Sequence, residues 1–185
     1  MEFPVPTSEL SGRIDQISIS SGGVPKLPIP EGKVTELGIV GDRQTSSRVH
    51  GGPHKALCLF SLEQLEVLRS EGHPIGPGST GENVTIAGVD WRLVLPGSRL
   101  RLGREVLIEV TGYADACWKN AGWFTDGDFT HIDHAARPGF GRVYARVLET
   151  GVIRPGDSVE LLVASAAERL SRQRIPSIRW PEDFR

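Results

Sequence analysis

Short runs of aliphatic and β-branched residues recur along the chain, separated by glycines and prolines. Residues 13–20 alternate between apolar and polar side chains, which is the pattern of a strand with one face toward solvent. Residues 101–110 show the same pattern around a predicted hairpin turn at Gly103 and Arg104. Short strands at this spacing favour an all-β barrel or sandwich. The predicted strands are residues 12–20, 56–61, 83–86, 98–102, 106–111, 142–149 and 158–163.

Helical patterns are fewer and shorter. Residues 61–70 begin with Ser61, a good helix cap, and place Leu62, Leu65 and Leu68 at helical spacing. A second short helix is predicted at residues 165–174, before a proline breaks the pattern.

The 185 residues contain no internal repeat, low-complexity tract or obvious linker. A chain of this length is long enough to bury one hydrophobic core. We therefore predict a mainly β domain over residues 1–164 with a few short helices. A C-terminal helix and extended tail, residues 165–185, would pack on this domain or extend from it.

Composition and charge exclude several classes of protein. A formal charge of −2 argues against a general binder of nucleic-acid polymers, and the locally basic residues 169–179 are interpreted as a solvated tail. The sequence has no run of about 18 apolar residues to span a membrane, and no signal peptide is visible. We expect a cytoplasmic protein, with no membrane partner, whose two cysteines are reduced thiols.

Residues 49–56 form a glycine-rich turn that carries His50, His54 and Lys55, and a second such turn upstream carries Arg43. Glycines let the backbone approach a ligand closely and leave N–H groups open to an anion. A guanidinium suits bidentate binding of phosphate or carboxylate. The alternative is two β-turns with solvated charges, and these residues alone favour that alternative.

Pairs of histidines also raise the question of a metal. His50 and His54 are suitably spaced, but no cysteine or carboxylate stands beside them at zinc-motif spacing. His131 and His134 lie in a polar connection, residues 125–141, where an exposed loop is favoured over a metal site.

The two cysteines differ in their surroundings. Cys58 lies in an apolar strand, where a thiol usually behaves as a small buried hydrophobe. Cys117 lies in a loop close to the cation of Lys119, and a thiol pKa is lowered by nearby positive charge together with solvent access. For Cys117 a functional and a structural role are equally open from the residues alone.

Taken in order, the motifs resemble the MOSC domain, named for the C-terminal domain of molybdenum-cofactor sulfurases. The chain is similar to the small stand-alone bacterial members, including the 6-N-hydroxylaminopurine resistance group. It departs from the family at Ala116, where members usually carry proline before the cysteine. The resemblance spans about residues 13–162 and rests on residues 41–43, 49–56, 81–85, 96–100, Cys117 and residues 151–159.

The resemblance implies a β-barrel with a pocket around the cysteine and a role tied to the pterin molybdenum cofactor. In the family, the residue at the position of Cys117 carries sulfur as a persulfide or ligates molybdenum, and a soft thiolate suits both tasks. Lys26 matches a lysine implicated in the small reductive members. The resemblance thus suggests catalytic roles for Cys117, His50 and Lys26, and cofactor-binding roles for Arg43 and Lys55 at phosphate, Asn83 at the pterin, and His54.

Three functions follow as hypotheses. The domain reduces N-hydroxylated compounds with bound molybdenum cofactor, or it carries sulfur or cofactor without turnover, with a cysteine desulfurase or a redox protein as partner. In the third, the barrel binds an unrelated small molecule, because fold does not fix function. Although the domain is associated with pyridoxal phosphate, we expect no such desulfurase activity here, since the chain is too short for the additional domain.

Overall fold

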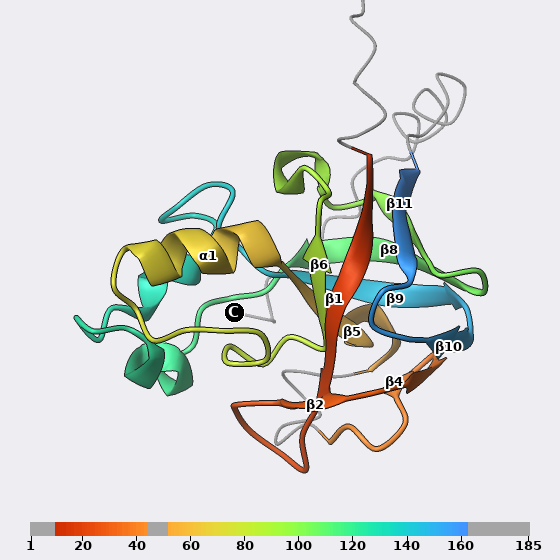
Figure 1. The fold of residues 1–185 in the computed structure, drawn as a ribbon, viewed down its shortest axis with the longest axis horizontal. Coiled ribbons are helices and arrows are strands. Elements are labelled where there is room, and N and C mark those ends of the chain that lie inside the picture. Colours follow the sequence, from red (N-terminus) through yellow and green to blue (C-terminus); the bar gives the residue numbers. More distant parts are fainter. Residues whose placement is uncertain (1–9, 44–51, 163–185) are drawn as a thin grey trace, which may run out of the picture.

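The computed structural model describes residues 10–43 and 52–162, and a closed β-barrel forms its centre (Figure 1). Most neighbouring strands are antiparallel, whereas β5 and β6 run parallel. The barrel closes where Ser11 of the first strand pairs with Glu160 of the last. Its strands, in order around the barrel, are β1 (Ser11–Ile19), β6 (Val84–Ala87), β5 (Leu57–Ser61), β9 (Val143–Glu149), β8 (Val106–Tyr113), β7 (Arg99–Leu102) and β11 (Ser158–Leu162).

Smaller elements surround the barrel. Strand β2 (Leu27–Ile29) pairs with the end of β1, and a separate sheet contains β10 (Gly151–Ile153), β3 (Gly32–Thr35) and β4 (Gly38–Ile39). Helix α1 (Leu62–Ser70) lies on the left of Figure 1, beside the segment that contains two short 3-10 helices. The described residues include the 3-10 helices η2 (Pro53–Lys55), η3 (Trp91–Leu93), η4 (Trp118–Trp123) and η5 (Phe129–Ile132).

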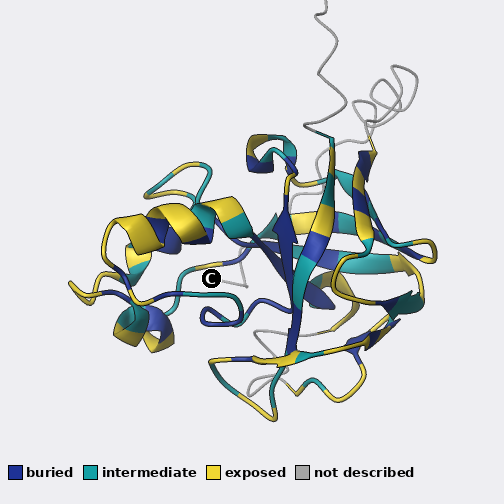
Figure 2. Ribbon diagram, in the orientation of Figure 1, coloured by how far each residue is buried: buried dark blue, intermediate teal, exposed yellow. Residues whose placement is uncertain are grey.

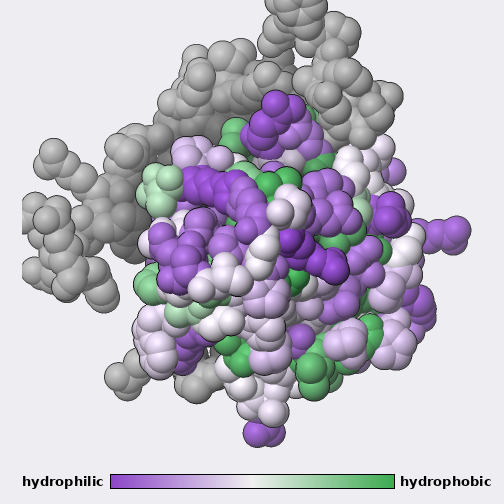
Figure 3. Space-filling model, turned by 60° about the vertical axis from the view of Figure 1, so that its left-hand side comes forward, coloured by the Kyte–Doolittle hydropathy of each residue, from purple (hydrophilic) through white to green (hydrophobic). Residues whose placement is uncertain are grey.

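The core fills the barrel and continues outward under α1. All residues of β5 and β6 are buried, so Figure 2 shows these strands dark blue. Successive side chains of β5 point to opposite sides. Phe60 packs edge-on against Trp91, with ring centroids 6.4 Å apart. On the surface of the molecule that carries α1, hydrophobic residues are scattered among hydrophilic ones (Figure 3).

Helix α1 begins at a side-chain cap that also fixes its position. The Ser61 hydroxyl oxygen accepts the main-chain N–H of Gln64 at 3.3 Å, and the hydroxyl donates to Glu63 at 2.7 Å. The other oxygen of Glu63 accepts the N–H of Gly88, just after β6. Because Leu65 and Leu68 are fully buried, the cap and the apolar face hold the helix against the barrel together.

The structure confirms the predicted fold class, the seven predicted strands and the first helix, with ends shifted by one or two residues. Gly103 turns between β7 and β8 with φ of +60°, as the hairpin prediction requires. Sequence reasoning missed β2, β3, β4 and β10, which have two to four residues each.

The predicted C-terminal helix and tail, residues 165–185, lie outside the described residues, so the division of the chain at residue 164 stays a prediction. In the described part of the chain, no helix has the length and apolarity that crossing a membrane requires.

Replacing the cap residue tests how α1 is held. We expect Ser61→Ala to lower the free energy of unfolding by about 1 kcal/mol, because the N–H of Gln64 loses its acceptor. Ser70→Ala, at the exposed end of the same helix, should change it by less than about 0.5 kcal/mol. Urea denaturation measures both values, and equal losses in the two variants would contradict the assigned cap.

Candidate functional site

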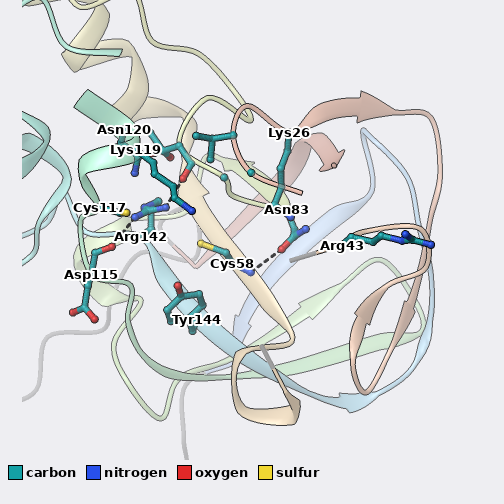
Figure 4. Close-up of a pocket in the computed structure, with 14 residues that line it drawn as sticks. Lys26, Arg43, Cys58, Asn83, Asp115, Cys117, Lys119, Asn120, Arg142 and Tyr144 are labelled. Atoms are coloured by element: carbon teal, nitrogen blue, oxygen red, sulfur yellow. Dashed lines mark hydrogen bonds between the residues drawn. The ribbon is translucent and has the colours of Figure 1, made fainter. Parts of the chain in front are cut away.

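A pocket of about 110 Å³ lies against β5 and β9, with further walls from the segments around residues 23–26, 80–83 and 115–120 (Figure 4). Four of its lining residues are basic and one is acidic, so the lining favours an anionic or electron-rich ligand. The lining residues are Gly23, Val24, Lys26, Arg43, Cys58, Thr80, Gly81, Asn83, Asp115, Cys117, Lys119, Asn120, Arg142 and Tyr144.

The structure brings together four of the residues that the sequence suggested. Lys26, Asn83 and Cys117 line the pocket, and Arg43 lines it from the far side, where its side chain extends away from Cys117 (Figure 4). His54 and Lys55 belong to η2 and are not among the described lining residues. His50 lies outside the described residues.

Cys117 stands at the position immediately before η4, and it is partly exposed. Its carbonyl accepts the N–H of Asn120 at 2.8 Å, which starts the 3-10 turn. The same turn places Lys119 and Asn120 in the pocket wall. This segment therefore presents a reachable thiol and an exposed ammonium to one cavity.

The side chain of Asn120 is buried, and its Oδ1 atom has no hydrogen-bond partner among the described residues. A buried acceptor without a partner costs free energy, in the range of about 1–3 kcal/mol. A ligand that places an N–H or O–H donor there would relieve that cost.

Lys26 is a buried ammonium whose charge is balanced by Asp42. Nζ lies 2.5 Å from both carboxylate oxygens of Asp42, and both side chains are less than a tenth exposed. The carboxylate also accepts the main-chain N–H of Ser20 at 2.9 Å and the amide Nδ2 of Asn83 at 2.9 Å. Asp42 thus fixes Lys26 in the pocket wall. The sequence alone did not predict this role for Asp42.

Asn83 connects this ion pair to the strand of the buried cysteine. Its Nδ2 donates to Asp42 and to the carbonyl of Ser18, and its Oδ1 accepts the N–H of Cys58 at 3.1 Å. The main chain of Asn83 also donates to the carbonyl of Cys58 at 2.7 Å. Both ends of the amide are engaged inside the protein, so its first role is to position its neighbours.

Arg142 joins two segments of the pocket lining. One guanidinium nitrogen donates to the carbonyl of Thr80, and the other donates to the carbonyl of Asp115 at 2.9 Å. The side chain is buried, and its Nε has no partner among the described residues. Sequence reasoning placed Arg142 at the start of a strand and missed its part in the site, since a basic residue at a strand end usually reaches solvent.

Cys58 is buried as expected for an apolar strand, but it also lines the pocket, which the sequence did not indicate. Burial raises the pKa of its thiol to about 11, and the nearby Arg142 only partly opposes this effect. Cys58 is therefore a neutral thiol near pH 7, and the two cysteines of the pocket differ sharply in exposure.

Lys55 contacts the aromatic ring of Tyr144, a residue that lines the pocket. Its Nζ lies 5.0 Å from the centroid of the Tyr144 ring, which is within the range of a cation–π contact. Tyr144 lines the pocket, and burial raises the pKa of its hydroxyl to about 12. His54 is exposed, and its carbonyl accepts the hydroxyl of Thr111 at 2.6 Å.

Comparison with known proteins gives a family match. Residues 46–160 match the MOSC domain family. The chain is 33% identical over 123 residues to the uncharacterized protein YflK of Bacillus subtilis, a stretch that covers 66% of this chain and 54% of YflK. It is 30% identical over 130 residues to a protein of Gibberella moniliformis named Reductase, covering 68% of this chain and 22% of that protein. The chain thus spans about half the length of YflK and less of the fungal protein.

The fold is shared with a solved structure. The crystal structure of YiiM from Geobacillus stearothermophilus matches with a TM-score of 0.65 and 24% identity, over 85% of this chain and 78% of that one. At this level of identity the likeness concerns the fold.

Removing the charge of Asp42 tests the buried ion pair. We expect Asp42→Asn to lower the free energy of unfolding by about 3–5 kcal/mol, because it leaves the Lys26 ammonium buried without a counter-charge. The control is Asp90→Asn, whose partner Arg92 is 78% exposed, and there the loss should stay below about 1 kcal/mol. Chemical denaturation distinguishes the two, and similar small losses would contradict a structural role for Asp42.

The two thiols should differ in their reaction with iodoacetamide at neutral pH. Only a thiolate that solvent can reach reacts readily. We expect Cys117 to be alkylated first, and Cys58 to stay unmodified until the pH approaches about 11 or the protein unfolds. Peptide mass spectrometry identifies the modified residue, with Cys117→Ser as the control that should remain unlabelled while folded. Labelling of Cys58 at the same rate would contradict its burial.

Proposed function

Because the chain belongs to the MOSC domain family, we propose that its pocket binds the molybdenum cofactor and that the protein reduces N-hydroxylated compounds. The observation that carries this proposal is the meeting of a partly exposed cysteine, Cys117, with four basic side chains in one pocket. The fungal relative named Reductase adds support for reductive chemistry.

The lining residues fit such a cofactor in chemical character. The Cys117 sulfur is a soft donor of the kind that soft metal centres prefer. The Oδ1 of Asn120, which has no partner in the described part of the chain, suits the N–H donors of a pterin. Arg43 and Lys119 are exposed, so they suit the phosphate. A cavity of about 150 Å³ is large enough to enclose a benzene ring. The pocket of about 110 Å³ therefore suits the reacting end of a ligand, and the rest of the ligand would lie at the pocket opening.

When bound, the cofactor supplies the two electrons that reductive cleavage of an N–O bond requires. The reaction also consumes two protons: the nitrogen keeps a hydrogen in place of the hydroxyl, and the hydroxyl leaves as water. Lys26 is the residue we assign to protonate the leaving oxygen, because its ammonium lines the pocket and Asp42 holds it in place. Figure 4 shows its side chain running toward Asn83.

The two cysteines divide the work in this proposal. Cys117 is the metal ligand, because its segment leaves the thiol partly exposed. Cys58 stays protonated, because its pKa is raised to about 11, and a protonated thiol is a poor ligand and nucleophile. It therefore forms part of the pocket floor.

A sulfur-carrier role is the second candidate, favoured by the partial exposure of Cys117 at the start of η4. A thiol that a partner protein can reach is able to accept sulfane sulfur from a cysteine desulfurase as a persulfide. Such a carrier needs neither Lys26 nor a bound metal.

The test is expression of the full chain in a host that makes the cofactor, followed by anaerobic purification. We expect molybdenum to copurify with the wild-type protein, and reduced viologen to drive the reduction of an N-hydroxylated purine. Cys117→Ser should lower the rate by about a hundred-fold or more, whereas Cys58→Ser should retain most of it. Metal analysis and product chromatography provide the measurements.

Two outcomes would contradict the reductase. The first is a wild-type protein without molybdenum from the competent host. The second is Cys117→Ser with full activity. If the metal is absent and the mass of Cys117 increases by about 32 Da, one sulfur atom, after incubation with a cysteine desulfurase, the carrier role replaces the reductase.

A further inference from the structure

Two histidines and an aspartate meet at the end of α1, away from the pocket. His73 lies in the connection that follows α1, and Asp126 and His131 come from the segment that includes η4 and η5. Each offers one ligand atom, and these atoms all lie within 4.8 Å of one another. None of the three residues lines the pocket. On the left of Figure 1, α1 and this segment lie beside each other.

The three side chains already interact. His131 Nε2 lies 2.7 Å from Asp126 Oδ2, and the rings of His73 and His131 have centroids 4.7 Å apart. His73 is buried, His131 is half-buried and Asp126 is exposed, so the cluster has an anchored inner side and an outer side open to solvent. The structure thus gives His131 two partners that the loop interpretation of residues 125–141 did not foresee.

We propose that His73, Asp126 and His131 form a binding site for a divalent transition-metal ion of the zinc class. Imidazole and carboxylate are preferred zinc ligands, and three protein ligands leave a fourth position for water. Ligand atoms around tetrahedral zinc lie about 3.4 Å apart when each bond is about 2.1 Å. The observed separations, 2.7 Å between Nε2 of His131 and Oδ2 of Asp126 and at most 4.8 Å overall, bracket that value.

Thr125 supplies the outer contact that a metal-bound histidine needs. A ligating imidazole usually donates its second ring N–H to a neighbouring acceptor. The hydroxyl of Thr125 lies 3.2 Å from Nδ1 of His73, so it can accept that proton while Nε2 binds the metal. The main-chain N–H of Thr125, 3.3 Å from the same nitrogen, would then give up its contact.

The ion would join α1 to the segment that presents Cys117. That segment runs from Cys117 through η4 to His131, and Arg137 already holds the following residues to Glu71 at 2.6 and 2.9 Å. A metal bond adds a second connection between the same two parts. The proposed role is structural, and it does not depend on whether the pocket binds a molybdenum cofactor.

The experiment uses the full chain, freed of metal with a chelator and titrated with Zn²⁺ by calorimetry and with Co²⁺ by visible absorption. We expect one ion per chain, d–d bands from bound cobalt, and a rise in Tm at saturating zinc. Asp126→Asn and His131→Ala should each weaken binding by about ten-fold or more and abolish the rise in Tm. Circular dichroism of both variants verifies that they are folded.

Two controls separate this site from nonspecific binding. Asp128→Asn removes the same charge two residues away and keeps the cap on Thr130, so zinc binding should not change. His54→Ala removes an exposed histidine outside the cluster and should also leave binding unchanged. Unchanged binding in Asp126→Asn and His131→Ala, or a loss of binding in His54→Ala, would overturn the proposal.

Discussion

The carboxylate of Asp42 holds three separate parts of the chain in one place, and the pocket depends on it. Its oxygens accept the ammonium of Lys26, the main-chain N–H of Ser20 and the amide of Asn83. A buried ammonium is tolerated only when a partner compensates its lost hydration. Because Asn83 in turn binds the main chain of Cys58, the network extends from the loop of Lys26 to the barrel wall.

The second constraint is the difference between two thiols of one pocket. Cys58 comes from the interior of the barrel wall, where burial raises its pKa to about 11. Cys117 comes from a loop that leaves it partly exposed. Arg142 connects two segments of the pocket lining, since it donates to the carbonyls of Thr80 and Asp115. The barrel therefore supplies a rigid floor, and the segment before η4 supplies the reachable sulfur.

Local pattern predicted most of the fold because the barrel strands alternate or are apolar throughout. The shortest strands were not predicted, because a strand of two to four residues is too short to show an alternation of apolar and polar residues. One of them, β2, also contains Pro28. At the site, family resemblance selected Cys117, Lys26 and Asn83, which the structure places in one pocket. The partners that organise them were missed, because a buried role for Asp42 follows only from contacts between residues distant in sequence.

The same reason explains the histidines. A histidine in a polar loop gives no sign of a partner that is distant in sequence, so His131 suggested an exposed loop, whereas the fold brings His73 beside it. Arg142 is a parallel case, since its sequence neighbours indicate only a strand.

The proposed bond between the sulfur of Cys117 and molybdenum can be measured by X-ray absorption at the molybdenum edge. We expect molybdenum to have one sulfur neighbour fewer in Cys117→Ser than in the wild-type protein, both loaded in the same host, with Cys58→Ser unchanged from wild type. Identical sulfur shells in the wild type and Cys117→Ser would contradict it.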